Sequence, residues 1–107
     1  MSHTLKQILL LAEKGEVRIS EHGYDELAAD CIFVHDIMAT LQDAALIEDY
    51  PEYPKGPCIL VLQRDQDGKP IHAVWGIPKG KNTPAVLVTA YRPDPAQWQD
   101  NFRRRKI

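Results

Sequence analysis

Apolar residues recur at two different periods along the chain, and this divides it into a helical part and a strand-rich part. The first helical pattern runs from Leu5 to Ala12 and stops before Gly15, a residue type that readily takes the left-handed conformation after a helix. Two further helical patterns cover 21–29 and about 34–43, the second with apolar residues at relative positions 0, 3, 4 and 7. Such spacing places apolar side chains on one face of a helix.

Alternating or continuous apolar runs predict five strands. Short connections favour an antiparallel meander of the last four, with a hairpin turn at Asp65 to Gly68. Because the second and third helices follow the first strand consecutively, we expect the helices on one face of the sheet. The strands are expected over 16–20, 45–50, 58–63, 70–77 and 85–92.

The end of the sequence predicts a short helix. Asp94 and Pro95 suit its N-cap and first position, and Gln97 completes a pattern resembling a capping box. Trp98 and Phe102 are four residues apart, so one helix face would bring both onto the sheet. The expected fold class is α+β: an antiparallel sheet of four to five strands, two helices packed on one face, and N-terminal and C-terminal helices, in a single domain.

Composition narrows the class of protein. The 107 residues are 44% hydrophobic and 26% charged, which is ordinary for a globular domain and excludes a disordered chain. No apolar run reaches the roughly 18 residues that span a membrane, and the first residues lack a signal-peptide pattern, so a cytoplasmic protein is expected. Cys31 and Cys58 fit neither a Cys-x-x-Cys pair nor zinc-finger spacing, and we expect reduced thiols, no metal and no cofactor.

Charge is distributed unevenly between the two halves. Residues 1–54 carry 3 Lys or Arg against 11 Asp or Glu, whereas residues 55–107 carry 10 against 4. The basic half suits a polyanion such as RNA. The alternative is that the acidic half supplies only solvated helix faces.

Two histidines are the first candidates for chemistry. His22 follows the expected N-cap Ser20, and the positive end of a helix disfavours a protonated imidazole. His72 lies in the middle of a strand, on the face opposite Trp75. RNA cleavage through the 2′-hydroxyl needs one group that removes a proton and one that donates a proton. The structural alternatives are a backbone-bonded His22 at a helix–sheet junction and a His72 paired across strands.

Four more side chains complete the candidate site. Lys79 and Lys81 flank a glycine in a loop, where backbone can approach a phosphate closely. Tyr91 can stack on a base and Arg92 can bind a phosphate; because neighbours on a strand point to opposite faces, one cleft takes both only where the strand twists or ends. The alternatives are an ordinary exposed loop, a half-packed tyrosine and a surface arginine. The basic run Arg103 to Lys106 suits a nucleic acid or an acidic partner, or is a solvated chain end.

Five short motifs follow one another along the chain. They are Ile19-Ser-Glu-His22 at a helix start, Ile47-Glu-Asp-Tyr-Pro51, Gly56-Pro57, Pro70-Ile-His72, and Val88-Thr-Ala-Tyr-Arg-Pro93 leading to Trp98. Together these motifs resemble the DUF4258-type family of small bacterial domains of unknown function, and the resemblance covers about residues 16–105.

That family is similar in expected fold to the RelE-like and barnase-like endoribonuclease toxins. The resemblance therefore implies a RelE-like fold, metal-independent endoribonuclease activity, RNA as substrate and a cognate antitoxin-like protein as partner. Members of the family often carry arginines where this chain has Glu26 and Asp30, so the alternative is a non-catalytic protein-binding module on the same fold. The roles implied are catalytic for His22, His72 and Tyr91, and substrate-binding for Lys79, Lys81 and Arg92.

Overall fold

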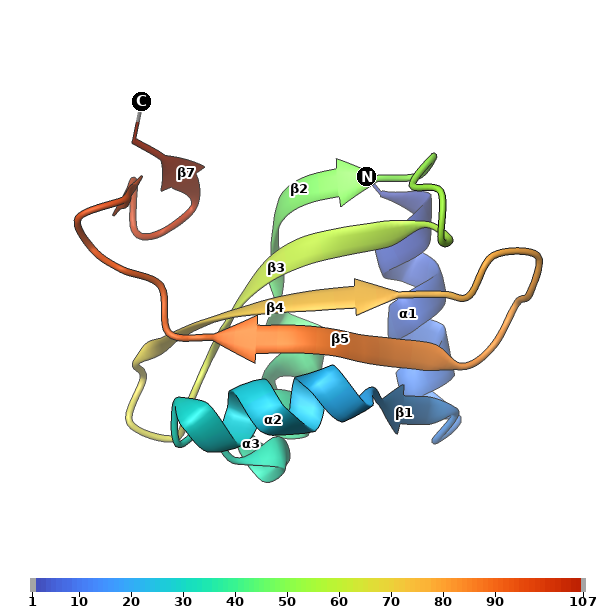
Figure 1. The fold of residues 1–107 in the computed structure, drawn as a ribbon, viewed down its shortest axis with the longest axis horizontal. Helices are drawn as coiled ribbons and strands as arrows, with labels where there is room; N and C mark the ends of the chain where they lie inside the picture. The colour runs from blue at the N-terminus through green and yellow to red at the C-terminus, as the bar shows by residue number, and fades with distance from the viewer. Residues whose placement is uncertain (1, 107) are drawn as a thin grey trace.

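The computed structural model describes residues 2–106 and has an α+β fold built on a five-stranded sheet (Figure 1), which confirms the predicted fold class. A small two-stranded sheet follows near the C-terminus. In chain order the elements are α1 (His3–Glu13), β1 (Val17–Ile19), α2 (Glu21–Ala29), α3 (Val34–Thr40), the 3-10 helix η1 (Leu41–Asp43), β2 (Ala45–Tyr50), β3 (Cys58–Arg64), β4 (Pro70–Gly76), β5 (Ala85–Tyr91), β6 (Trp98–Gln99) and β7 (Arg104–Arg105).

The five-stranded sheet is mixed. Its strand order is β1-β5-β4-β3-β2, and β2 to β5 form the predicted antiparallel meander. The short strand β1 instead pairs in parallel with β5, with Val17 opposite Ala85. The expectation of a wholly antiparallel sheet was therefore wrong at this edge, because a three-residue apolar alternation fixes which side chains face inward but not the direction of pairing.

All three helices contribute to one core on one face of the sheet, as expected for α2 and α3 from their consecutive order. In Figure 1, α1 runs behind the strands and α2 lies along the edge near β5 and β1. The opposite face of β2 to β5, which we call the open face, carries no helix. No helix within residues 2–106 is long and apolar enough to cross a bilayer. The buried cluster includes Leu5, Ile8, Leu27, Ile37, Ile59, Val61, Ile71, Trp75 and Leu87.

The start of α2 is fixed tightly against β5. The side chain of Ser20 accepts a hydrogen bond from Gly23 N–H at 2.9 Å, as its predicted N-cap role requires. The same hydroxyl donates to the carbonyl of Val88 at 2.9 Å. A Cβ on Gly23 would lie 2.8 Å from the carbonyl oxygen of Leu87, so glycine permits this close approach of helix and strand.

The predicted C-terminal helix is wrong, because residues 98–105 form the β6–β7 hairpin. Asp94 does begin a turn, since its side chain accepts from Ala96 N–H at 2.8 Å. Helical geometry then fails because Asp100, Asn101 and Phe102 have positive φ angles of 54°, 57° and 67°, which no right-handed helix contains. Asp and Asn tolerate a positive φ angle better than most residues do. The capping pattern at 94–97 indicates a helix start, whereas Asp100 and Asn101 are compatible with the observed turn.

Candidate functional site

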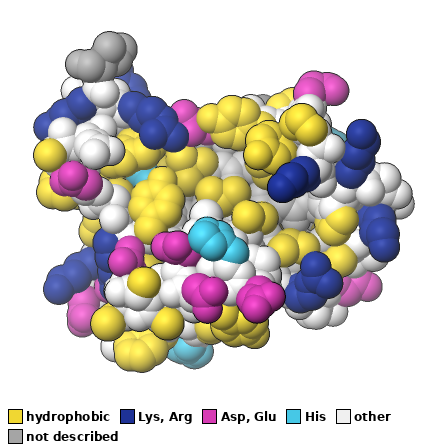
Figure 2. All heavy atoms as spheres, viewed as in Figure 1, with side chains coloured by type: hydrophobic (Ala, Val, Ile, Leu, Met, Phe, Trp, Pro, Cys, Tyr) yellow, Lys and Arg dark blue, Asp and Glu magenta, His cyan; other side chains and the backbone are white. Residues whose placement is uncertain are grey.

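A cavity of about 540 Å³ lies on the open face of the sheet. Its volume is within the range of ligand-binding clefts. Figure 2 shows hydrophobic side chains gathered over this face, with Lys and Arg side chains on both flanks. The lining residues are Arg18, Glu48, Tyr50, Tyr53, Lys55, Gly56, Cys58, Ile59, Leu60, Val74, Gly76, Ile77, Pro78, Val86, Val88, Tyr91 and Arg105.

The floor of the cavity is apolar because strand alternation sends small hydrophobic side chains to this face. Leu60 comes from β3, Val74 from β4, and Val86 and Val88 from β5. Their neighbours Val61 and Trp75 belong to the core under the helices instead. An apolar floor of this kind favours a flat, weakly polar group over a strongly hydrated one.

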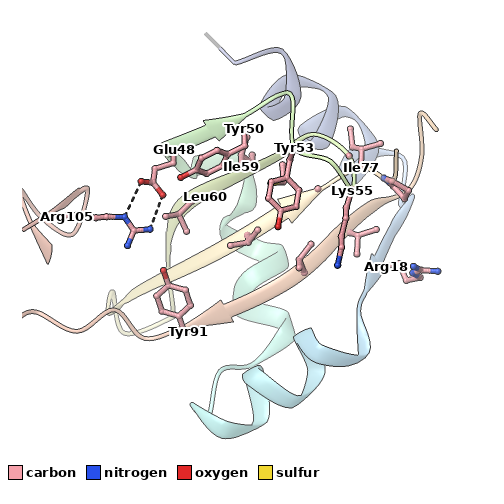
Figure 3. A pocket seen from close by; sticks show the side chains of 17 residues that line it. Arg18, Glu48, Tyr50, Tyr53, Lys55, Ile59, Leu60, Ile77, Tyr91 and Arg105 are labelled. Atoms are coloured by element: carbon pink, nitrogen blue, oxygen red, sulfur yellow. Dashed lines mark hydrogen bonds and ion pairs between the residues drawn. The ribbon is translucent and has the colours of Figure 1, made fainter. Parts of the chain in front are cut away.

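Three tyrosines surround the floor. Tyr50 ends β2, Tyr53 follows in the β2–β3 connection, and Tyr91 ends β5. Figure 3 shows Tyr53 reaching over the strands from this connection and Tyr91 projecting from the opposite side of the cavity. Aromatic rings in such positions provide surfaces on which a planar ligand can stack.

Cationic side chains lie at both ends of the cavity. Figure 3 shows Arg18 and Lys55 at one end and Arg105 at the other. The backbone at Gly56 places Lys55 at this end. Gly56 has a φ of +124°, and a Cβ at this position would collide with the carbonyl oxygen of Ile77. Only glycine therefore lets the β2–β3 connection cross so close to the end of β4.

Glu48 and Arg105 form a two-point ion pair at the second end of the cavity. Arg105 Nε donates to Glu48 Oε2 at 3.2 Å and its Nη2 donates to Oε1 at 3.1 Å. The hydrogen bond from Arg105 lowers the pKa of Glu48, so this carboxylate is ionised at neutral pH. This end of the cavity therefore carries an ionised carboxylate.

His72 is completely buried beside this ion pair, under the C-terminal hairpin. Its Nε2 lies 2.7 Å from the carbonyl oxygen of Phe102 and its Nδ1 lies 3.3 Å from the hydroxyl of Tyr91. Because a carbonyl only accepts, Nε2 carries the proton and Nδ1 accepts from Tyr91. Burial lowers the pKa of His72, so the imidazole is neutral. The ring of Trp98 covers it edge-on, with centroids 4.3 Å apart.

Tyr91 connects buried His72 to the cavity. Its ring lies edge-on to the imidazole, with centroids 5.4 Å apart, and its hydroxyl is bonded to Nδ1. Burial raises the pKa of Tyr91, which keeps the hydroxyl protonated. The cavity therefore presents an ionised carboxylate, Glu48, and a protonated hydroxyl, Tyr91, which donates to His72 Nδ1.

The structure does not bring His22 and His72 together. The side chain of His22 is 65% exposed on α2, and its Nε2 lies 3.6 Å from Glu26. His22 does not line the cavity. Both ring nitrogens of His72 are occupied by Tyr91 and Phe102, so an acid–base pair of the two histidines would require a rearrangement.

The predicted substrate-binding cations lie around the cavity rather than in it. Arg92 forms an ion pair with Asp65 at 2.8 Å and donates to the carbonyl of Pro70 at 3.3 Å, which ties it to the β3–β4 turn. Lys79 and Lys81 are exposed in the β4–β5 loop. The backbone N–H of Lys79 donates to the carbonyl of Lys55 at 3.1 Å, so this loop adjoins the cationic end of the cavity.

Several lining residues have no counterpart in the sequence prediction. Glu48 and Tyr50 share one face of β2, and Tyr53 and Lys55 belong to a proline-rich segment that the sequence identifies only as a loop. The signal for the first two was the alternation of β2, which places a carboxylate and a tyrosine side by side. Arg105 belongs to the basic run Arg103 to Lys106, but its place at the cavity depends on a hairpin that the sequence does not predict.

Within residues 2–106, no group of three or more His, Cys, Asp or Glu side chains is arranged to hold a metal ion. Cys31 is exposed after α2, and Cys58 on β3 lines the cavity. Burial raises the pKa of Cys58, so its thiol is protonated at neutral pH.

Comparison with known proteins gives one match. The family model described as "Domain of unknown function (DUF4258)" matches residues 19–92, which run from the end of β1 to just beyond β5. Neither the curated proteins nor the solved structures contain a match to the chain. The matched segment includes Tyr91 and His72 and ends before the C-terminal hairpin.

Proposed function

The chain belongs to the DUF4258 family of domains of unknown function, and from this premise we propose that it binds single-stranded RNA on the open face of the sheet and cleaves it without a metal ion. The observation that carries the proposal is the composition of the open-face cavity. It combines an apolar floor, three tyrosines, cations at both ends, and a carboxylate with a tyrosine hydroxyl. RNA can engage all four features: its bases the apolar floor and the tyrosines, its phosphates the cations, and its ribose and backbone oxygens the carboxylate and the tyrosine hydroxyl.

Binding follows from the division of the cavity into apolar and charged parts. A base would lie on the valine and leucine floor and stack against Tyr53 or Tyr91, since every base offers a flat face. Arg18 and Lys55 would contact the phosphates that flank this base. A duplex hides its base faces, so the arrangement favours a single strand.

Cleavage follows from Glu48 and Tyr91. Glu48, once Arg105 has turned from its carboxylate to the substrate phosphate, removes the proton of a ribose 2′-hydroxyl, whose oxygen then attacks the adjacent phosphorus. The bond from phosphorus to the 5′-oxygen breaks, and the Tyr91 hydroxyl, whose proton turns from His72 Nδ1 to the leaving group, donates that proton to the 5′-oxygen. The products are a 2′,3′-cyclic phosphate and a 5′-hydroxyl end, and solvent returns the proton from Glu48 to Tyr91. His72 acts as a positioning residue that fixes the Tyr91 hydroxyl. This is the reaction class of the RelE-like and barnase-like ribonucleases, to which the family is expected to be similar in fold.

The test is cleavage and binding of a synthetic single-stranded RNA in EDTA. We expect wild-type protein to release 2′,3′-cyclic phosphate ends and Tyr91→Phe to be slower by about 100-fold or more, the usual contribution of a proton donor. Tyr53→Ala should weaken binding by about fivefold or more through lost stacking. Lys6→Ala on α1, behind the sheet, is the matched control for Lys55→Ala, which should weaken binding through a lost phosphate contact.

A folded wild-type protein that neither binds nor cleaves RNA would contradict the proposal. Binding without cleavage in any sequence tested would remove the role of Glu48 and Tyr91 in chemistry. The sequence-based site is tested in the same assay by His22→Ala and Lys79→Ala. If His22→Ala abolishes cleavage and Tyr91→Phe does not, the two-histidine arrangement is the correct one.

A second candidate, a protein-binding module, is favoured by one separate observation. Tyr24 on α2 and Phe33 before α3 are 56% and 65% exposed, and both lie in the acidic half of the sequence. Such a surface suits a basic, antitoxin-like partner. Phe33→Ala should abolish capture of such a partner and leave RNA cleavage unchanged; the reverse result would remove this candidate.

A further inference from the structure

We propose that residues 94–106 form a displaceable strap, which closes one end of the open-face cavity by keeping Glu48 and His72 occupied. When the strap lifts, the carboxylate of Glu48 is released and the imidazole of His72 is uncovered. The inference goes beyond RNA binding, because it concerns access to these two side chains whatever the ligand is.

The strap touches the rest of the protein through few side chains. Among residues 94–106 only Trp98 is buried, at 6% exposure, and Phe102 is half-buried. Trp98 packs edge-on against His72, and the guanidinium of Arg105 lies over the Trp98 ring, 4.7 Å from its centroid. Contact with the sheet is therefore concentrated in one aromatic side chain and the groups beside it.

These few contacts occupy the functional groups at that end of the cavity. The carbonyl of Phe102 accepts the proton on His72 Nε2 at 2.7 Å. Arg105 engages both oxygens of Glu48. If Glu48 is the base that RNA cleavage requires, the closed strap holds that base in an ion pair.

The strap is bonded internally, so it can move as a unit. Trp98 pairs with Arg105 and Gln99 pairs with Arg104 across the hairpin, and Lys106 N–H donates to the carbonyl of Gln97 at 2.8 Å. The family match ends at residue 92, directly after β5 and before the first residue of the strap. The hairpin therefore lies outside the segment that defines the family.

Two features make the closed position easy to leave. The Arg105 side chain of the ion pair is 59% exposed, and exposed ion pairs hold weakly and are screened by salt. Phe102, a bulky residue, has a φ of 67°, a conformation that costs energy for a residue of this kind. A chain of phosphates would compete with Glu48 for Arg105, helped by the neighbouring cations Arg103, Arg104 and Lys106.

The test is the rate at which diethyl pyrocarbonate modifies each histidine, measured by mass spectrometry of peptides from the intact protein. In wild type, exposed His22 should react and buried His72 should be protected. Arg105→Glu places two carboxylates against each other, so His72 should react at least about tenfold faster while His22 is unchanged. The charge-swapped pair Glu48→Arg with Arg105→Glu should restore protection.

Arg104→Glu is the matched control, since it makes the same charge change one residue away, at a side chain with no hydrogen bond or ion pair within residues 2–106. His72 should remain protected in it. Continued protection of His72 in folded Arg105→Glu would overturn the proposal, and so would equal exposure in the two single variants. If Arg105→Glu does not fold, Arg105→Gln replaces it; this variant removes the pair without repulsion, and His72 should then react at least about twofold faster than in wild type. No RNA is used, so the outcome is independent of the RNA-binding proposal.

Discussion

Gln63 is a buried amide that joins α3 to the sheet. It is 2% exposed, and its Oε1 accepts from Trp75 Nε1 at 2.9 Å. Its Nε2 donates to the carbonyl of Ile37 at 2.6 Å and to the hydroxyl of Thr40 at 3.2 Å. One side chain thus satisfies polar groups from two layers, which fixes how α3 sits over the core.

We expect Gln63→Leu to lower the free energy of unfolding by about 2–3 kcal/mol, because it leaves the indole N–H and the Ile37 carbonyl without partners. Urea denaturation measures this change. The control is the same substitution in a Trp75→Phe background, where the indole donor is already gone and the cost should be smaller. Equal costs in the two backgrounds would show that the Gln63–Trp75 bond contributes nothing.

The stability of the protein should depend on pH through His72. An unfolded histidine takes up a proton near pH 6.5, whereas burial lowers the pKa of His72 in the folded protein. Between pH 6.5 and that lower pKa the unfolded chain binds more protons than the folded protein does. The contribution of His72 to the free energy of unfolding is therefore fully present above pH 6.5 and is lost as the pH falls toward the folded pKa. The groups facing His72 keep their charge in this window: Tyr91 stays neutral, Glu48 ionised and Arg105 cationic.

We therefore expect His72→Gln to flatten the loss of stability between pH 7.5 and 5.5, by up to about 1 kcal/mol per pH unit. Urea denaturation at the two pH values is the measurement. His22→Gln is the matched control for the substitution itself on an exposed surface. An identical pH dependence in wild type and His72→Gln would contradict the buried, neutral imidazole.

Single residues were predictable from sequence where the cause is local. Ser20 caps α2 because its hydroxyl reaches an N–H three residues ahead, and a sequence displays that relation directly. His72 faces away from Trp75, as strand alternation requires. Its partners Phe102 and Tyr91 were not predictable, because they lie 30 and 19 residues away and meet it only in the folded chain.

At the scale of elements, the β2–β3 connection depends on Gly56. We expect Gly56→Ala to lower the free energy of unfolding by at least about 2 kcal/mol, since alanine adds a collision with Ile77 to the cost of a positive φ. Gly68 has a φ of +78° and open space where a Cβ would lie, with no atom within 4 Å. It is the matched control, and its alanine variant should lose only about 1 kcal/mol. Urea denaturation compares them, and equal losses would contradict the close crossing of the two loops.

Elements were predictable to the extent that apolar periodicity continues over several residues. The predicted strand at 45–50 has the observed limits of β2, and the strand predicted over 58–63 ends one residue later in the structure, at Arg64. The prediction of a C-terminal helix was wrong because Trp98 and Phe102, although spaced as in a helix, both contact His72 from a hairpin. Two apolar residues are too short a pattern to distinguish these structures.

At the scale of the whole molecule, the candidate site exists only because distant segments meet on one face. Arg18 precedes α2, Glu48 lies on β2, Tyr91 ends β5 and Arg105 belongs to the last hairpin. The sequence indicated the correct layer arrangement and two lining residues, Tyr91 and, within the basic run Arg103 to Lys106, Arg105. Two other features were not predictable from the sequence: which loops cross at Gly56, and the path of the chain after Pro93. These two features determine which cations flank the cavity.

The open face as the RNA site is tested most directly by nuclear magnetic resonance of ¹⁵N-labelled protein titrated with a 2′-O-methyl oligonucleotide. This probe keeps the bases and phosphates of RNA but lacks the nucleophile, so it binds without being cleaved. We expect the largest shifts of amide signals at Tyr50, Tyr53 and Val88, around the cavity. Shifts confined to the surface of α2 and α3 near Tyr24 and Phe33, or no shifts at saturating probe, would contradict the account.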